Sequence, residues 1–356
     1  MPSPDDLLIA LNSAPGLGRA AACRLAQAVE RWRPGRRAGG SAAVLAGELG
    51  VPAEAVERAR ALALWAAELA AAERRAARRA GGRLVTVRDA DYPERLRHLA
   101  LPPPVLYLRS ELPPGPAVAI VGSRNADPYG LEAAGLFARA LAAAGVVVVS
   151  GFARGVDAAA HEGALAGGGY TVAVLGCGVD IVYPVEHRAL AAEVAGRGAL
   201  VSELPCGTLP RPFNFPVRNR IIAALALGTL VIQATPRSGS LITARHALEL
   251  GREVFALPGR IFDERSLGPN ALLRDGAVLV QHPKDVLEAF DRITPSHPRP
   301  LSPSDPGPPG GRGAPPPASG DSPSGSAGDG EGASDGAGAP LPGLKGRLLG
   351  ALAPGC

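Results

Sequence analysis

Residues 146–165 read VVVVSGFARGVDAAAHEGAL, and this stretch decides the fold. Four consecutive valines followed by serine and glycine indicate a short strand that is buried on both faces. A turn of small residues that carries Arg154 comes next, and the alanine-rich run after Gly155 favours a helix. A strand that leads through a tight turn into a helix is the repeating unit of a parallel α/β sheet.

The same pattern recurs on both sides of this stretch. Short apolar runs predict strands at 84–87, 105–108, 117–121, 146–149, 171–175, 199–202, 229–233, 253–257 and 277–280. Helical segments separate most of them, which predicts a mostly parallel sheet with helices on both faces. We therefore expect an α/β, doubly wound, Rossmann-like domain over residues 80–291.

The two ends of the chain differ from this central part. Helical periodicity near 5–12, 18–32, 41–48 and 52–79 predicts a small all-helical domain over residues 1–79. Within it, residues 14–28 resemble a helix-hairpin-helix, although an ordinary turn between two helices fits equally well. Residues 292–342 are almost entirely Pro, Gly, Ser, Ala and Asp, which predicts a disordered linker. Residues 343–356 begin a helix and stop, as the start of a missing or degenerate C-terminal module would.

The overall composition narrows the class of protein. With 46% hydrophobic and 20% charged residues, the chain has the composition of a globular protein. Its four cysteines form no C-x-x-C pair and its six histidines are scattered, so we expect no disulfide framework and no metal site. The chain has acids near its start and no run of about 18 apolar residues, so we expect a cytoplasmic protein without membrane contact.

The arginines are informative through their positions rather than their number. The net charge is +4 and only two of the 37 basic residues are lysine, a bias that GC-rich coding alone produces. In open α/β sheets, ligands bind beyond the carboxyl ends of the strands. Three of the loops that follow predicted strands combine glycine or serine with an arginine: residues 122–124, 150–155 and 234–240. Glycine permits close backbone approach and arginine binds phosphate oxygens, so we expect an anion site there.

Residues 212–225, PFNFPVRNRIIAAL, add aromatic side chains to this basic set. Phe213 and Phe215 stand beside Arg218 and Arg220 in a chain that has only seven phenylalanines. An aromatic ring next to arginines is typical of proteins that stack a base and hold the backbone of single-stranded nucleic acid. In the alternative interpretation the rings are core residues, and one arginine pairs with an acid such as Glu203.

Sequence motifs of catalysis are weak. The chain has no G-x-x-x-x-G-K-[ST], no G-x-G-x-x-G after a strand and no G-x-S-x-G. Asp157 and His161 are four residues apart and would share one helix face, as an acid–base pair could. We favour a structural role, in which Asp157 lies in the first helical turn and His161 packs on the sheet with one ring nitrogen bonded. We predict no catalytic residues.

Several blocks of the sequence together resemble one family. They are Gly122-Ser123-Arg124 with Tyr129-Gly130, then 150–165, 171–187, 201–208, 214–225, 238–259 and 268–277. Their order and spacing are similar to those of the DNA-processing protein A family (DprA, also called Smf) over about residues 84–290. The resemblance also covers the helical N-terminal segment, as a sterile-alpha-motif-like or helix-hairpin-helix extension.

The resemblance implies a function. Members of that family bind single-stranded DNA without sequence preference, load the recombinase RecA during natural transformation, act as homodimers and need no cofactor. Carried over to this chain, the DNA-binding residues would be Gly122, Ser123, Arg124, Gly151, Ala153, Arg154, Phe215, Arg218, Arg220, Ser238, Gly239, Ser240 and Thr243. Two departures are Gln233, where the family usually has glutamate, and the C-terminal winged-helix module of many members. Residues 343–356 would be the truncated start of that module, with only its first helix near 344–352.

Two other functions remain as alternatives. Rossmann-like nucleotide-processing enzymes of the phosphoribohydrolase type would use Asp157 with His161, or Glu203. Their P-G-G-x-G-T-x-x-E pattern is absent, because the nearest stretch, residues 238–248, lacks the glutamate. A structural scaffold that binds only a small nucleotide is the third possibility.

Overall fold

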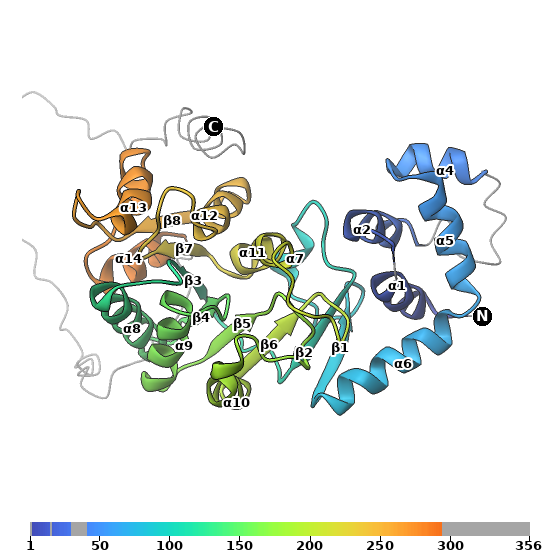
Figure 1. Cartoon of the computed structure of the whole chain (residues 1–356), viewed down its shortest axis with the longest axis horizontal. Helices are drawn as coiled ribbons and strands as arrows, with labels where there is room; N and C mark the ends of the chain where they lie inside the picture. Colours follow the sequence, from blue (N-terminus) through green and yellow to red (C-terminus); the bar gives the residue numbers. More distant parts are fainter. Residues whose placement is uncertain (1, 15, 30–40, 294–356) are drawn as a thin grey trace, which may run out of the picture.

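The computed structural model describes residues 2–14, 16–29 and 41–293, and Figure 1 shows how their elements are arranged. In this described part, one sheet contains nine strands in the order β1-β2-β6-β5-β4-β3-β7-β8-β9. The strands are β1 (Gly82–Thr86), β2 (Val105–Arg109), β3 (Ala117–Val121), β4 (Val147–Ser150), β5 (Thr171–Val174), β6 (Gly198–Ser202), β7 (Gly228–Val231), β8 (Glu253–Ala256) and β9 (Val278–Leu279). Each of the nine predicted apolar runs overlaps one of them.

The sheet is parallel from β6 to β9, and β3 lies near its middle. The edge strands β1 and β2 pair antiparallel with each other, and β2 pairs antiparallel with β6. Successive residues of β3 face opposite sides, so Val118 and Ile120 enter one hydrophobic cluster while Ala119 and Val121 enter another. Because both faces of the central strands are buried, these strands are mostly apolar, which is the pattern that the sequence has.

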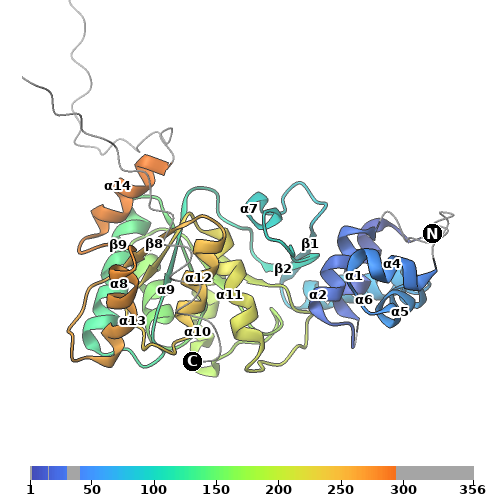
Figure 2. The same cartoon turned by 90° about the horizontal axis from the view of Figure 1, so that it is seen from above.

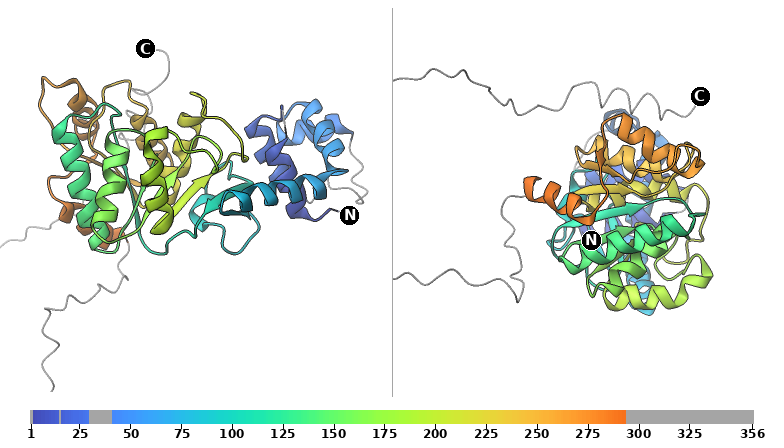
Figure 3. Two further views of the ribbon diagram at one scale, coloured as in Figure 1. Left: turned by 60° about the horizontal axis from the view of Figure 1, so that its bottom comes forward. Right: turned by 90° about the vertical axis from the view of Figure 1, so that its left-hand side faces the viewer.

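Helices cover both faces of the sheet (Figure 3). On one face lie α8 (Pro128–Ala143), α9 (Val156–Ala166), α10 (Arg188–Gly196), preceded by the short 3-10 helix η1 (Val185–His187), and α14 (Pro283–Ile293). The other face is covered by α7 (Glu94–Arg97), α11 (Asn214–Leu225), α12 (Ser240–Glu249) and α13 (Glu264–Arg274). The predicted doubly wound, mostly parallel α/β fold is confirmed.

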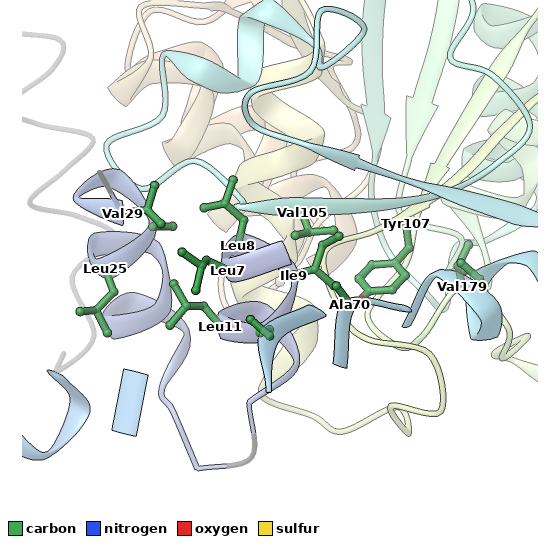
Figure 4. Close-up of a cluster of buried hydrophobic side chains, with 14 of the residues drawn as sticks. Leu7, Leu8, Ile9, Leu11, Leu25, Val29, Ala70, Val105, Tyr107 and Val179 are labelled. Atoms are coloured by element: carbon green, nitrogen blue, oxygen red, sulfur yellow. The ribbon is translucent and has the colours of Figure 1, made fainter. Parts of the chain in front are cut away.

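The N-terminal helices gather at one end of the molecule, beside β1 and β2 (Figure 2). They are α1 (Pro4–Ser13), α2 (Arg19–Gln27), α4 (Ala42–Leu49), α5 (Ala53–Ala63) and α6 (Ala66–Arg79). Figure 4 shows that their apolar side chains continue into the sheet, since Ile9 and Ala70 belong to one cluster with Val105 and Tyr107 of β2. The helical segment and the sheet therefore share buried surface, and a domain boundary at residue 79 stays a prediction.

One helix prediction was wrong in detail. The periodic stretch 52–79 is two helices, α5 and α6, which are separated at Leu64 and Trp65. Both of these side chains are exposed, whereas Ala66, Ala70 and Ala77 of α6 are fully buried, and α6 packs along α1. No glycine or proline marks the break, so tertiary packing rather than local sequence sets it. The predicted linker and C-terminal module lie, beyond residue 293, outside the described residues.

Candidate nucleic-acid interface

The order of strands creates a crevice next to β3. From β3 the chain builds β4, β5 and β6 on one side, and then returns to place β7 on the other side of β3. At such a switch point the loops that leave neighbouring strands diverge, and ligands bind beyond the strand ends. A cavity of about 1820 Å³ lies there, lined by the loops after β3, β7 and β8, by Ala153 after β4 and by the start of α11.

Most of the predicted site residues come together at this cavity. Its lining includes Gly122, Ser123, Arg124, Ala153, Phe215, Arg218, Ser238, Gly239, Ser240 and Thr243. They arise from three separate loops and two helices, which the sheet brings to one edge. The remaining three residues, Gly151, Arg154 and Arg220, do not line the cavity.

Phe215 is the centre of an aromatic and cationic cluster. The guanidinium carbon of Arg124 lies 5.3 Å from the centre of its ring, and that of Arg218 lies 5.9 Å away. The ring of Tyr183 is tilted against it at 5.8 Å between ring centres. Phe215 is half-buried, so part of its ring faces the cavity. Phe213, by contrast, is 61% exposed and is not part of the lining.

The loop after β4 packs closely on the loop after β3. Gly155 has a φ of +75°, and a Cβ there would lie 2.3 Å from the carbonyl oxygen of Ser123. Only glycine satisfies both conditions without strain. A Cβ at Gly151 would likewise meet the carboxylate of Asp157 at 2.6 Å and the guanidinium of Arg218 at 2.7 Å. The two glycines therefore let two loops and two charged groups share a space that has no room for a side chain.

Arg218 is a buried residue at the floor of the cavity rather than an exposed cation. Its side chain is 4% exposed, and its Nη1 donates hydrogen bonds to the carbonyl oxygens of Gly151 and Val174. Burial lowers the pKa of Arg218 to about 10, against the opposite effect of Asp157, so it stays charged at neutral pH. Its Nη1 joins β4, β5 and α11, and a direct contact of Arg218 with the DNA backbone stays a prediction.

Arg220 and Arg154 are not part of the cavity lining, and their role in DNA binding stays a prediction. Arg220 donates to Glu203 and to the carbonyl oxygen of Leu101, so the alternative pairing with Glu203 is the one that forms. Arg154 forms an exposed ion pair with Glu186. Neither guanidinium faces the cavity.

Glu203 also connects the helical segment to the site. It is 3% exposed and accepts from Arg19 of α2 at 3.1 Å as well as from Arg220. Arg19 donates in addition to the side-chain oxygen of Asn214, the first residue of α11, at 3.2 Å. Because Phe215 follows Asn214, this ion cluster fixes the helix end from which the aromatic ring reaches the cavity.

The start of α12 supplies hydroxyl and amide donors. Ser238 and Ser240 bond through their hydroxyls at 2.7 Å, and Gly239 is the residue that caps the helix. Thr243 lies one turn further and is buried. The N-terminus of a ten-residue helix carries partial positive charge, so this wall is suited to an anion.

Asp157 and His161 have structural roles, as favoured from the sequence. Asp157 is in the first turn of α9, where its Oδ2 accepts from the amide of Ala153 at 3.3 Å. His161 is fully buried, with Nδ1 2.6 Å from the hydroxyl of Thr171. Burial lowers the pKa of His161 to about 3, with smaller contributions from His187 and Arg218. The imidazole is neutral and does not reach the cavity.

Gln233, the departure noted in the sequence, is a structural amide. Its Nε2 donates to Asp127 Oδ1 at 2.9 Å, and its Oε1 accepts from the Asp127 amide at 3.3 Å. Asp127 caps α8 by accepting from Gly130 N. The amide thus gives and takes a hydrogen bond with one residue, which a carboxylate could not do.

Sequence reasoning missed one wall of the cavity, which consists of Tyr129 and the loop between β8 and α13 with Arg260 and Phe262. The signal was available, because Pro258-Gly259-Arg260 follows an apolar strand as the other glycine–arginine loops do. The described residues contain no cluster of three or more His, Cys, Asp or Glu that could hold a metal ion. Within the same residues no helix is long and apolar enough to cross a membrane.

Known proteins share both sequence and structure with this chain. A sequence profile described as DNA recombination-mediator protein A matches residues 83–291. Protein Smf of Escherichia coli is 51% identical over 172 residues, which are 48% of this chain and 46% of that protein. DNA processing protein DprA of Streptococcus pneumoniae is 41% identical over 208 residues, 58% of this chain and 73% of that protein. The match spans about half the length of the E. coli protein and of its Synechocystis relative.

Two solved structures extend the similarity to the fold. The X-ray structure of DprA from S. pneumoniae superposes with a TM-score of 0.68 at 32% identity, over 81% of this chain and 98% of that one. A DprA structure from Helicobacter pylori, described for its single-stranded DNA binding mode, superposes with a TM-score of 0.54 at 31% identity. The superposition covers 60% of this chain and 98% of that one. With the profile covering more than half of its residues, the chain belongs to the DNA recombination-mediator protein A family.

Proposed function

We propose that this protein binds single-stranded DNA without sequence preference and acts as a recombination mediator that loads RecA onto the bound strand in natural transformation. The observation that carries the proposal is the cluster around Phe215, where an exposed arginine lies 5.3 Å from an aromatic ring that faces a large cavity. A ring stacks on any base, and an arginine beside it binds the phosphate that follows.

Arg124 is the residue that best fits phosphate binding. It is exposed, and among the described residues it forms no ion pair. Its charge is therefore available to a phosphate, whereas Arg218 and Arg220 already bond to groups of the protein. An arginine that replaces water and counterions at a phosphate contributes directly to the salt dependence of binding.

The absence of sequence preference follows from the kinds of groups at the cavity. Stacking on Phe215 and donation from Ser238, Ser240 and the helix end engage features that every nucleotide has. RecA contact, homodimer formation and a cytoplasmic location are proposed from membership of the family. We also propose that the protein binds nucleic acid without catalysing a reaction on it.

The geometry does not favour the phosphoribohydrolase alternative. Glu203 is enclosed between Arg19 and Arg220 and does not line the cavity, and His161 is buried behind Phe152. Asp157 lines the cavity but is buried against Arg218. Release of free base from a nucleoside monophosphate, lost in Glu203→Gln, would support that alternative instead.

A titration tests the proposal. Fluorescence polarisation of labelled oligothymidylate and of a duplex of equal length, at several salt concentrations, should show preferential and salt-sensitive binding of the single strand. Arg124→Ala should weaken binding about tenfold, whereas Arg139→Ala, which removes an exposed charge from α8 outside the cavity, should not. Equal affinity for single strand and duplex would contradict the proposal.

A further inference from the structure

The loop between β8 and α13 carries a phenylalanine that the fold does not use. Phe262 is 95% exposed, the most exposed large apolar side chain among the described residues, and it lines the cavity. Isolated apolar residues on a surface need no explanation. This one differs because it lies at the rim of a cavity that already contains a half-buried aromatic ring and an arginine without an ion pair.

The loop is held firmly at both ends. Gly259 and Asn270 exchange two hydrogen bonds, at 3.1 Å from the Gly259 amide and 3.0 Å to its carbonyl oxygen. Asp263 caps α13 by accepting from Arg265 N at 2.9 Å and pairs with the Arg265 side chain at 3.1 Å. The residues between these anchors, with Phe262 at the outer end, are therefore presented to solvent by a fixed frame.

The two aromatic rings lie over distant parts of the sheet edge. Phe215 is packed on Gly176, just after β5, whereas Phe262 follows β8. Four strand spacings separate β5 from β8, which is a span of about 19 Å at about 4.8 Å per spacing. At the duplex spacing of about 3.4 Å per nucleotide, such a span corresponds to roughly five or six nucleotides, and fewer in an extended strand.

The charges at the cavity trace a route between the rings. Arg124 and Arg260 are exposed and have no ion pair among the described residues. Arg265 neutralises Asp263 at 3.1 Å and approaches Asp127 at 4.0 Å. The exposed Glu264 also lines the cavity, so a nucleic-acid backbone is expected to follow the two arginines and to avoid the start of α13.

We infer that Phe262 is a second base-stacking position, with Arg260 holding a neighbouring phosphate, so that a single strand runs from Phe215 across Arg124 to the β8–α13 loop. This inference rests on the proposed function, because it extends the path of the same ligand. A base that covers the ring removes its apolar surface from water and adds stacking, whatever the identity of the base.

Neighbouring residues supply a matched test. Phe262→Ala should weaken binding of an oligothymidylate of about 15 nucleotides by about tenfold, whereas Ile261→Ala should change it by less than about twofold. Ile261 is 72% exposed on the same loop but does not line the cavity. With an oligonucleotide of about 2 nucleotides, which is too short to reach both rings even when extended, Phe262→Ala should bind nearly as well as wild type.

A spectroscopic measurement separates stacking from indirect effects. In Phe262→Trp the added indole fluorescence should be quenched when the oligonucleotide binds, and the affinity should be retained, whereas in Ile261→Trp it should not be quenched. Melting curves check that each variant is folded, which is expected because both side chains are exposed.

Arg124→Ala, measured in parallel, distinguishes the two levels of the proposal. If Arg124→Ala weakens binding while Phe262→Ala matches Ile261→Ala, the second stacking position is refuted and the proposed function stands. If wild type shows no preference for single strands, both are refuted.

Discussion

Two pairs of arginines show how differently the same residue type is used in this fold. Arg124 and Arg260 lie at the rim of the cavity, exposed and without an ion pair among the described residues. Arg218 and Arg220, both on α11, are engaged by carbonyl oxygens and by Glu203. The rim pair is available to a ligand, whereas the α11 pair holds strands and helices together. Burial and pairing, rather than residue type, decide which of these arginines has a charge available to a ligand.

The largest effect should come from the ion cluster at Glu203. Glu203→Gln keeps the shape of the side chain but leaves Arg220, which is 14% exposed, without its counter-charge. We expect a loss of about 3 kcal/mol in the free energy of unfolding, measured by urea denaturation. Glu186→Gln, which breaks the exposed pair with Arg154, is the control and should leave the denaturation midpoint unchanged. Equal denaturation midpoints for the two variants would contradict the claim that the buried Glu203 pair stabilises the fold more than the exposed Glu186 pair.

Arg218→Met should destabilise the protein next most strongly. The change removes the donors to Gly151 and Val174 and leaves Asp157 buried beside an apolar chain. Because burial already raises the pKa of Asp157, this acid can become neutral, which limits the cost to about 2 kcal/mol in urea denaturation. A variant as stable as wild type would show that the hydrogen bonds of Arg218 do not stabilise the fold.

Acid should act through the buried histidine. The pKa of His161 is about 3 in the folded protein and about 6.5 when unfolded, so its stabilising effect is complete above pH 6.5 and is lost as the pH falls toward 3. Its contribution to the slope of stability against pH reaches about 1.4 kcal/mol per unit in that window. Asp157, whose pKa is raised, acts in the opposite direction. His161→Leu should therefore show a flatter decline, measured by denaturation at stepped pH; an unchanged slope would contradict the assignment.

The sequence predicted the scaffold better than the surface. Nine apolar runs matched nine strands of the described chain because strands that are buried on both faces consist mostly of apolar residues. The rotation of α11 about its axis could not be predicted from the sequence. A helix with Phe215, Arg218 and Arg220 has no clear polar face, so its rotation depends on how it packs on the sheet. The cavity wall at Phe262 was not predicted, although its loop also places a glycine and an arginine directly after an apolar strand.

Arg124→Ala should affect binding and not stability. Its guanidinium is exposed and lies over the ring of Phe215, so the free energy of unfolding should be unchanged. Affinity for oligothymidylate should fall about tenfold, since one phosphate contact is lost for every sequence alike. Polarisation titrations against oligonucleotides of different composition check this; a loss confined to one composition would indicate base reading instead.

Arg154→Ala should have the smallest effect on binding. The residue was expected from the sequence to hold DNA, but its guanidinium is paired with Glu186 and lies outside the cavity. We expect affinity within about twofold of wild type, because exposed pairs contribute little and the charge is already compensated.

The salt dependence of binding tests the central claim most directly. The slope of log affinity against log salt should be measured for wild type, Arg124→Ala and Arg154→Ala in one titration series with the same oligothymidylate. Each phosphate contact contributes about 0.7 to this slope for a single strand. The account predicts that Arg124→Ala reduces the slope by about that amount and that Arg154→Ala leaves it unchanged. An unchanged slope for Arg124→Ala, or an equal reduction for both, would contradict the division between free and paired arginines.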